Sequence, residues 1–214
     1  MLEASLRHEI SELGTALEAA ELLSMTAGNI SARAGSNVVI TPSGIAYSKT
    51  RAEDVVVCDL HDGHVVEGDC RPSSELPLHR AIYTARPDVG AVVHTHSMFA
   101  TTFALLREPI PAVHYMIARL GTPLVPVVDY ATYGSDSLAE LVFQALSEGV
   151  WAALLANHGA IAMGRNLAEA GKNAEILERL AEMYWRARSI GDPFVLPNEE
   201  IGRVAEQYKT YGQP

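Results

Sequence analysis

Two histidines separated by one residue, His94 and His96, end a run of apolar residues that begins at position 89. The apolar run predicts a buried strand. Because side chains two residues apart on a strand point to the same face, the two imidazoles would lie side by side. His158 also closely follows an apolar run, at positions 151–156. Three histidines that leave one coordination position open are typical of a catalytic zinc site, so we predict Zn²⁺ bound by His94, His96 and His158.

Two other interpretations of these histidines are open. Each could be an ordinary core or surface residue with one hydrogen bond, but a His-x-His pair at a strand end plus a third histidine beside a glycine favours a metal. A site with two histidines and one carboxylate would suit iron, yet it would favour a carboxylate where a histidine such as His96 stands. Zinc therefore fits the residue types best.

The segment at positions 71–75 (RPSSE) precedes a predicted helix and offers hydroxyls and a carboxylate. Ser73 and Ser74, together with the free backbone N–H groups of a helix start, could hold a phosphate, or they could simply cap the helix. Glu75 is a candidate general base if the metal lies nearby, and otherwise an acid that complements the helix dipole. His79 follows one turn later on the same face, and we assign it a structural role rather than that of orienting Glu75.

Two further loops, at positions 28–29 (GN) and 41–44 (TPSG), carry small residues that would let an anion approach the backbone. Neither loop is a Walker motif, and no GxGxxG follows a strand, which argues against ATP or a dinucleotide. Lysines are scarce, and Lys172 lies on a predicted solvated helix face, whereas a Schiff base needs a desolvated lysine. Carbonyl chemistry in this chain would therefore use a metal as Lewis acid.

The composition narrows the classes of partner. The 214 residues carry a formal net charge of −10, which argues against nucleic acid, and 48% of them are hydrophobic, enough for a large core. Cys58 and Cys70 do not form a disulfide scaffold or a zinc–cysteine pattern, which favours a reducing, cytoplasmic setting. Neither a signal peptide nor a membrane-spanning run is evident, so we expect no membrane partner.

Helices and strands alternate along the chain without a strict strand–helix–strand rhythm, which favours one mixed sheet with helices on both faces. The predicted helices cover positions 2–23, 75–85, 98–106, 137–147, 167–190 and 199–209. Besides the strand that leads to His94, the predicted strands cover positions 38–41, 55–60, 64–67, 112–115, 124–128, 151–156 and 160–163. No repeat or linker divides the chain, so we expect a single domain over residues 1–214.

These motifs resemble the class II aldolase and adducin family, typified by L-fuculose-1-phosphate aldolase, over nearly the whole chain. The family also includes L-ribulose-5-phosphate 4-epimerase and the head domain of adducin. The resemblance is carried by positions 26–29 (TAGN), 41–44 (TPSG), 72–75 (PSSE), 92–96 (VVHTH), 114–118 (HYMIA), 157–159 (NHG) and 209–212 (KTYG). Seven motifs in one order are far more specific than any one of them.

The resemblance implies a fold, an assembly and roles for particular residues. The fold would be a three-layer α/β/α sandwich around a mainly antiparallel mixed sheet, assembled as a homotetramer with active sites between subunits. Glu75 would be the acid/base, and Tyr115 and Tyr211 would reach in from the neighbouring subunit. Tyr133 and Tyr211 would border the aldehyde pocket, and Tyr133 stands where Phe is common, which leaves the aldehyde open. The residues implied for phosphate binding are Gly28, Asn29, Ser43, Gly44, Ser73 and Ser74.

The activity that the resemblance implies is zinc-dependent cleavage of L-fuculose 1-phosphate or a related deoxy-ketose 1-phosphate. The products would be dihydroxyacetone phosphate and an aldehyde such as lactaldehyde, with Tyr115 acting at the aldehyde oxygen. A 4-epimerase is the nearest alternative. The resemblance to such epimerases is weaker, because they carry Ser-Ser-Asp where this chain has Ser-Ser-Glu at positions 73–75, and this difference favours an aldolase. A pentulose-phosphate dehydratase is a further alternative. An adducin-like interaction module is a distant one, because such modules lose the three metal histidines.

Overall fold

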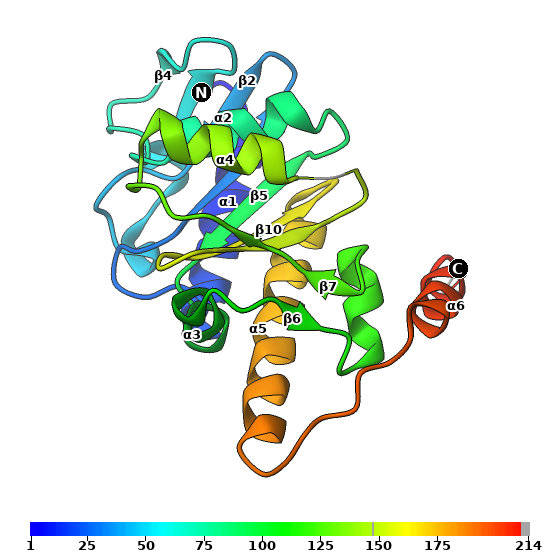
Figure 1. Ribbon diagram of the computed structural model, residues 1–214. Helices are drawn as coiled ribbons and strands as arrows, with labels where there is room; N and C mark the ends of the chain where they lie inside the picture. The colour runs from blue at the N-terminus through cyan, green and yellow to red at the C-terminus, as the bar shows by residue number, and fades with distance from the viewer. Residues whose placement is uncertain (147, 211–214) are drawn as a thin grey trace.

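An eight-stranded sheet forms the middle layer of the computed structural model, which describes residues 1–146 and 148–210 (Figure 1). The strands of this sheet are β1 (Asn29–Ala34), β2 (Asn37–Ile40), β3 (Val56–Asp59), β4 (Val65–Glu67), β5 (Ala91–Thr95), β8 (Val127–Val128), β9 (Ala152–Leu155) and β10 (Gly159–Gly164). They lie in the order β4-β3-β2-β1-β5-β10-β9-β8. All neighbours are antiparallel except β8 and β9, which are parallel. A separate pair is formed by β6 (Ile110–Pro111) and β7 (Leu124–Val125).

Helices cover both faces of the sheet and complete three layers. One face packs against α2 (Leu76–Ala85) and α4 (Asp136–Ala145). The other packs against α1 (Ala4–Ala19), α3 (Met98–Leu106) and α5 (Leu167–Arg188). Beyond the sheet, α6 (Asn198–Tyr208) packs against the 3₁₀ helix η3 (Tyr115–Leu120), and Figure 1 shows α6 set apart at the C-terminal side. The remaining 3₁₀ helices are η1 (Tyr47–Lys49) and η2 (Ala52–Asp54).

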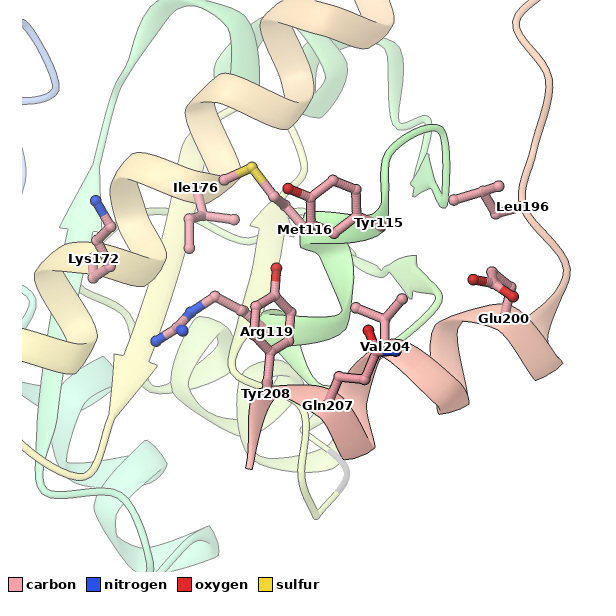
Figure 2. Close-up of a pocket in the computed structure, with 10 residues that line it drawn as sticks. All are labelled: Tyr115, Met116, Arg119, Lys172, Ile176, Leu196, Glu200, Val204, Gln207 and Tyr208. Atoms are coloured by element: carbon pink, nitrogen blue, oxygen red, sulfur yellow. The ribbon is translucent and has the colours of Figure 1, made fainter. Parts of the chain in front are cut away.

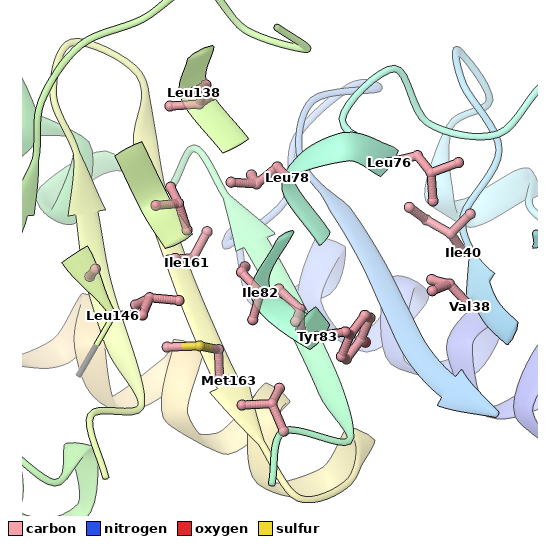
Figure 3. Close-up of a cluster of buried hydrophobic side chains, with 14 of the residues drawn as sticks. Val38, Ile40, Leu76, Leu78, Ile82, Tyr83, Leu138, Leu146, Ile161 and Met163 are labelled. Carbon is pink, nitrogen blue, oxygen red and sulfur yellow. The ribbon is translucent and has the colours of Figure 1, made fainter. Parts of the chain in front are cut away.

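The alternation of side chains along β5 assigns its residues to the two faces. Val92 belongs to the apolar cluster under α2 and α4, in which Ile82 is fully buried (Figure 3). Ala91 and Val93 belong to the cluster under α1 and the start of α5. Because successive strand residues point to opposite faces, His94 continues the face of Val92. The strand therefore delivers His94 to the layer that contains α2.

The predicted three-layer α/β/α sandwich around a mainly antiparallel mixed sheet is confirmed. The six predicted helices are present, with ends that differ by a few residues. The predicted helix at positions 2–23 ends already at Ala19. There the chain turns through Glu21, whose φ of 61° is left-handed, and folds Leu22 and Leu23 back into the core. The predicted end of the helix at position 147 lies outside the described residues.

The strand predictions were less accurate. The strand β1 was missed, because its face toward α2 carries the polar side chains of Asn29 and Ser31 instead of an apolar series. The strand predicted at positions 112–115 was wrong, since β6 ends at Pro111 and η3 begins at Tyr115. The strand predicted at positions 124–128 is divided at Pro126 between two sheets. Within the described residues, no helix is apolar and long enough to cross a bilayer.

Candidate functional site

Four side chains that could share one metal ion meet at the end of β5. Nε2 of His94 lies 2.9 Å from Nε2 of His96 and 3.0 Å from Oε2 of Glu75. Nε2 of His158 lies 3.4 Å from Oε1 of the same carboxylate. One ligand atom of each residue lies within 4.8 Å of the other three. The structure thus brings the three predicted metal histidines together and adds Glu75 to them.

The sheet register explains why these side chains meet. His94 pairs with Asn29 of β1 on one side and lies beside β10 on the other. Gly159, the first residue of β10, is so close to β5 that an added Cβ would lie 2.4 Å from the carbonyl oxygen of Thr95 and 2.9 Å from the ring of His96. Glycine is required here because any larger residue would push β10 away from the histidines.

The third histidine is held by a strained turn between β9 and β10. Asn157, just before His158, has a left-handed φ of 55°, a conformation that asparagine tolerates better than most residues. The backbone N–H of Asn157 donates to the carbonyl of Ala104 in α3. The side-chain oxygen of Asn157 accepts a hydrogen bond from Nε of Arg107. The backbone N–H of His158 donates to Leu155 and closes the turn. These contacts fix the imidazole from outside the cluster of Glu75 and the three histidines.

The hydrogen bonds of His94 test whether the cluster fits a cation. Nδ1 of His94 lies 2.9 Å from the carbonyl oxygen of Ala160, which can only accept, so the ring proton is on Nδ1. In the neutral ring that metal ligation requires, the lone pair on Nε2 faces the lone pairs of His96 and Glu75 at 2.9 and 3.0 Å. Oε1 of Glu75 is also buried without a hydrogen-bond partner. Electron pairs this close repel one another unless a cation lies between them, and nitrogen with carboxylate oxygen is a zinc ligand set.

The electrostatics of the cluster also suit a metal. Burial lowers the pKa of His96 and of His158 to about 4, assisted by the neighbouring His94. Both rings are therefore neutral at pH 7, as metal ligation requires. Burial alone would raise the pKa of Glu75, but a positive charge beside the carboxylate, which a protonated His94 supplies in the metal-free chain, and the amide of Asn29 outweigh it and lower the pKa below its ordinary value. Glu75 is thus a carboxylate at neutral pH.

A pocket of about 320 Å³ opens next to the cluster. It contains Glu75, His96 and His158 together with every residue predicted to bind phosphate, and also Tyr133. Tyr130 is a second aromatic residue in the pocket lining, and the sequence analysis did not identify it. The full lining consists of Thr26, Ala27, Gly28, Asn29, Pro42, Ser43, Gly44, Ser73, Ser74, Glu75, His96, Tyr130, Ala131, Tyr133, Asn157 and His158. This volume suits a small ligand.

Two serine-bearing loops of this pocket are joined to each other. The backbone N–H of Ser43 donates to the carbonyl of Arg71, and that of Ser73 donates to Thr41. Both serines therefore offer their hydroxyls rather than their amides to a ligand. Gly44 has a left-handed φ of 75° and open space beside its Cα. The lining contains neither Lys nor Arg, so an anion here would be held by hydroxyls and backbone N–H groups.

The start of α2 differs from the predicted capping. Glu75, not Ser73 or Ser74, occupies the N-cap position, and its side chain makes no capping hydrogen bond. The Ser73 hydroxyl instead accepts a hydrogen bond from the Glu75 amide at 3.3 Å. The Glu75 carboxylate is consequently free to turn toward His94.

Asn29, predicted as a phosphate ligand, lines the pocket but also has buried partners. Its Nδ2 donates to Oε2 of Glu75 at 2.9 Å, and its Oδ1 lies 2.5 Å from Nε2 of His79. His79 in turn lies 2.6 Å from the hydroxyl of Ser31. Sequence reasoning missed this arrangement, because the strand that carries Asn29 and Ser31 was itself missed. The i, i+4 spacing of Glu75 and His79 was the only signal of it.

The predicted catalytic Tyr115 does not reach the cluster within one chain. It is 49% exposed and lines a second cavity of about 840 Å³ between η3, α5 and α6, together with Met116, Arg119 and Tyr208 (Figure 2). Tyr115 is not part of the pocket beside the histidines. The other predicted aromatic residue, Tyr211, lies outside the described residues.

Residues 8–185 match the sequence pattern of the Class II Aldolase and Adducin N-terminal domain. The chain belongs to this family. A 5-methylthioribulose-1-phosphate/5-deoxyribulose-1-phosphate aldolase from Rhodospirillum rubrum is 45% identical over 208 residues, which are 97% of this chain and 93% of that protein. A 5-deoxy-D-ribulose 1-phosphate aldolase from Bacillus thuringiensis serovar kurstaki is 42% identical over 215 residues, the whole length of both.

A solved structure supports the same conclusion. The class II aldolase chain described here superposes on an L-fuculose 1-phosphate aldolase with a TM-score of 0.91 and 40% identity, covering 98% of each chain. The resemblance that the motifs predicted is confirmed. The family and these relatives together support an aldolase, a carbon–carbon lyase.

Proposed function

We propose that this class II aldolase cleaves a ketose 1-phosphate with a deoxy end, such as L-fuculose 1-phosphate or a 5-deoxypentulose 1-phosphate, to dihydroxyacetone phosphate and a short aldehyde. The observation that carries the proposal is the shared pocket: the His96, His158 and Glu75 side chains lie in the same pocket as the two serine loops. A ligand with a carbonyl near one end and a phosphate at that end could contact both sets. The relatives whose names specify ketose 1-phosphates support this substrate class.

His94, His96 and His158 would hold the metal, with Glu75 in reach of the same position. Zn²⁺ fits the nitrogen-rich donor set. When bound, it supplies a positive charge that stabilises the negative charge developing on the donor oxygens during cleavage. The Ala160 carbonyl orients His94 by accepting a hydrogen bond from its Nδ1–H.

Glu75 would carry the proton at the donor carbon. Its carboxylate is ionised at neutral pH and buried at the inner end of the pocket, where water does not compete for the proton. Ser43, Ser73 and Ser74 would bind the phosphate through their hydroxyls and the nearby backbone. Tyr130 and Tyr133 would border the far side of the pocket, where the aldehyde half lies.

We further propose that the active unit is a homotetramer whose sites lie between subunits. Tyr115, the acid/base at the aldehyde oxygen, is half-exposed and outside its own chain's pocket. It could act only on the pocket of another copy, which supports a shared site. Cyclic or dihedral assemblies of identical chains allow one surface to serve a neighbouring site in this way.

The test is a panel of ketose 1-phosphates given to the zinc-loaded protein. We would use L-fuculose, L-rhamnulose, 5-deoxyribulose and 5-methylthioribulose 1-phosphates, and measure dihydroxyacetone phosphate with a coupled reductase. At least one substrate should release it, with loss of activity in EDTA and recovery on adding zinc. A protein that binds about one zinc per chain and cleaves none of the panel would sink the proposal.

A pair of serine variants separates phosphate binding from general damage. Ser74→Ala removes a hydroxyl from the pocket and should raise KM with a smaller change in kcat. Ser137→Ala, on the exposed side of α4, is the matched control and should leave both constants unchanged. Equal effects of the two substitutions would remove Ser74 from its proposed role.

A further inference from the structure

A buried chain of hydrogen bonds leads from α2 through β1 to the Glu75 carboxylate. The hydroxyl of Tyr83 lies 2.8 Å from that of Ser31, which lies 2.6 Å from Nδ1 of His79. Nε2 of His79 lies 2.5 Å from Oδ1 of Asn29, and Nδ2 of Asn29 donates to Oε2 of Glu75 at 2.9 Å. Each of the five residues is at most 5% exposed. Ser31, His79 and Tyr83 lie outside the pocket lining, so water does not substitute for a missing partner at that end of the chain.

The chemistry of its two ends fixes the direction of this chain. A carboxylate only accepts, so the amide nitrogen of Asn29 must face Glu75 and its oxygen must face His79. Nε2 of His79 must then carry a proton. Burial lowers the pKa of His79 to about 3, so the ring is neutral and its Nδ1 accepts from Ser31. Ser31 in turn accepts from Tyr83, and every donor in the chain points toward Glu75.

We propose that His79 is a positioning residue that locks the Asn29 amide and thereby holds Glu75 by its Oε2, leaving Oε1 to carry the reaction's proton. Oε1 is buried without a hydrogen-bond partner and lies 3.4 Å from Nε2 of His158, whereas Oε2 accepts from Asn29 and lies 3.0 Å from Nε2 of His94. The two oxygens of one carboxylate are thus made unequal. The role of Glu75 in the reaction rests on the proposed function, but the orientation of the chain does not.

The locking has a simple physical basis. Without a donor on the far side, the Asn29 amide could rotate by half a turn and present its oxygen to Glu75. Two acceptors would then face each other in a buried place, a costly arrangement. The Nε2 proton of His79 makes the productive orientation the one in which all partners are satisfied, and the fully buried Ser31 and Tyr83 keep that proton on Nε2.

The first test measures the proton on His79 and needs no substrate. Protein labelled with ¹⁵N in its histidines would be studied by NMR at pH 7, with the His79 signals assigned by their loss in His79→Gln. We expect a neutral ring with the proton on Nε2 and none on Nδ1. A proton on Nδ1, or on both nitrogens, would overturn the inference, because the donor direction would be broken at its centre.

The second test uses three variants of α2 in the zinc-loaded enzyme. His79→Leu fills the space but removes both hydrogen bonds, and we expect kcat to fall by about 10- to 100-fold with KM little changed. His79→Gln can still place an N–H near Oδ1 of Asn29 and should recover most of the loss. Ile82→Ala, fully buried on the same helix, should lower the unfolding temperature without lowering kcat.

The outcomes separate this inference from the proposed function. If the wild-type enzyme cleaves nothing on the panel, the proposed function fails, while the NMR result still decides the orientation of the chain. If His79→Leu and Ile82→Ala lose stability alike and neither changes kcat, His79 is only a core residue. If His79→Leu fails to fold, His79→Gln and the NMR measurement remain as the deciding experiments.

Discussion

The carboxylate of Glu178, in the middle of α5, accepts a hydrogen bond from the backbone N–H of Phe99 in the first turn of α3 at 2.7 Å. Its other oxygen accepts from the amide of Ala100 at 2.8 Å and from the hydroxyl of Ser97 at 2.7 Å. The start of α3, immediately after His96, is therefore capped by a side chain about 80 residues away in sequence. Ser97, which occupies the N-cap position of α3, makes no capping bond with its own helix.

Replacing this remote cap should weaken both the fold and the metal centre. Glu178→Ala leaves two helix-start N–H groups without an acceptor and should cost about 2 kcal/mol of unfolding free energy, measured by urea denaturation. Because α3 begins two residues after His96, zinc should also be held less tightly in a chelator competition. Glu175→Ala on the same helix removes an exposed ion pair with Lys172. It should change neither the free energy of unfolding nor the affinity for zinc. Identical zinc affinity in both variants would contradict the link from the cap to the metal.

The contact between β5 and β10 at Gly159 makes a second prediction. Gly159→Ala adds a methyl group within 2.4 Å of the carbonyl oxygen of Thr95 and 2.9 Å of the His96 ring. The strands must separate, so we expect the purified protein to lose most of its zinc, measured by metal analysis, and to unfold at a lower temperature.

The matched control for this substitution is Gly202→Ala. Gly202 lies on the exposed face of α6 with open space beside its Cα. An alanine there should leave the zinc content unchanged and stabilise the helix by about 0.5–1 kcal/mol. Retention of full zinc by Gly159→Ala would show that β10 does not need its close approach to β5 to form the site.

The cluster of three histidines could be predicted from the sequence because its signals are local. His94 and His96 follow from strand geometry, and the motifs placed His158 and Glu75 with them. The layers of the fold follow from the alternation of predicted strands and helices, which favours one mixed sheet with helices on both faces. The remote cap by Glu178 and the chain through His79 could not be predicted, since both depend on contacts between segments far apart in sequence.

The errors have the same origin. The strand β1 was missed because Asn29 and Ser31 look like solvent-facing residues, although both are almost fully buried. They are buried because α2 supplies their polar partners, and this pairing is visible only in three dimensions. The strand predicted at positions 112–115 failed because Nδ1 of His114 accepts a hydrogen bond from the amide of Met116 and starts η3.

Burial of His79 makes the stability of the metal-free protein depend on pH. Its pKa is about 3 in the folded chain and 6.5 when solvated, so between these values the unfolded chain binds more protons. This contribution to stability is complete above about pH 6.5 and is lost as the pH falls toward 3. Urea midpoints in EDTA should fall more between pH 7 and pH 4.5 for wild type than for His79→Gln. Equal pH slopes for the two proteins would mean that His79 is charged in the folded state.

Subunit mixing tests whether Tyr115 acts on the pocket of another copy. Glu75→Gln removes the proton carrier and Tyr115→Phe removes the phenol, so each variant alone should be almost inactive while keeping its zinc. If each site takes Glu75 from one chain and Tyr115 from its neighbour, randomly mixed assemblies should regain roughly a quarter of wild-type activity. The variants must be mixed by unfolding and refolding together, with separately refolded samples as the control. Mixtures that stay as inactive as their components would show that Tyr115 and Glu75 are not shared between subunits.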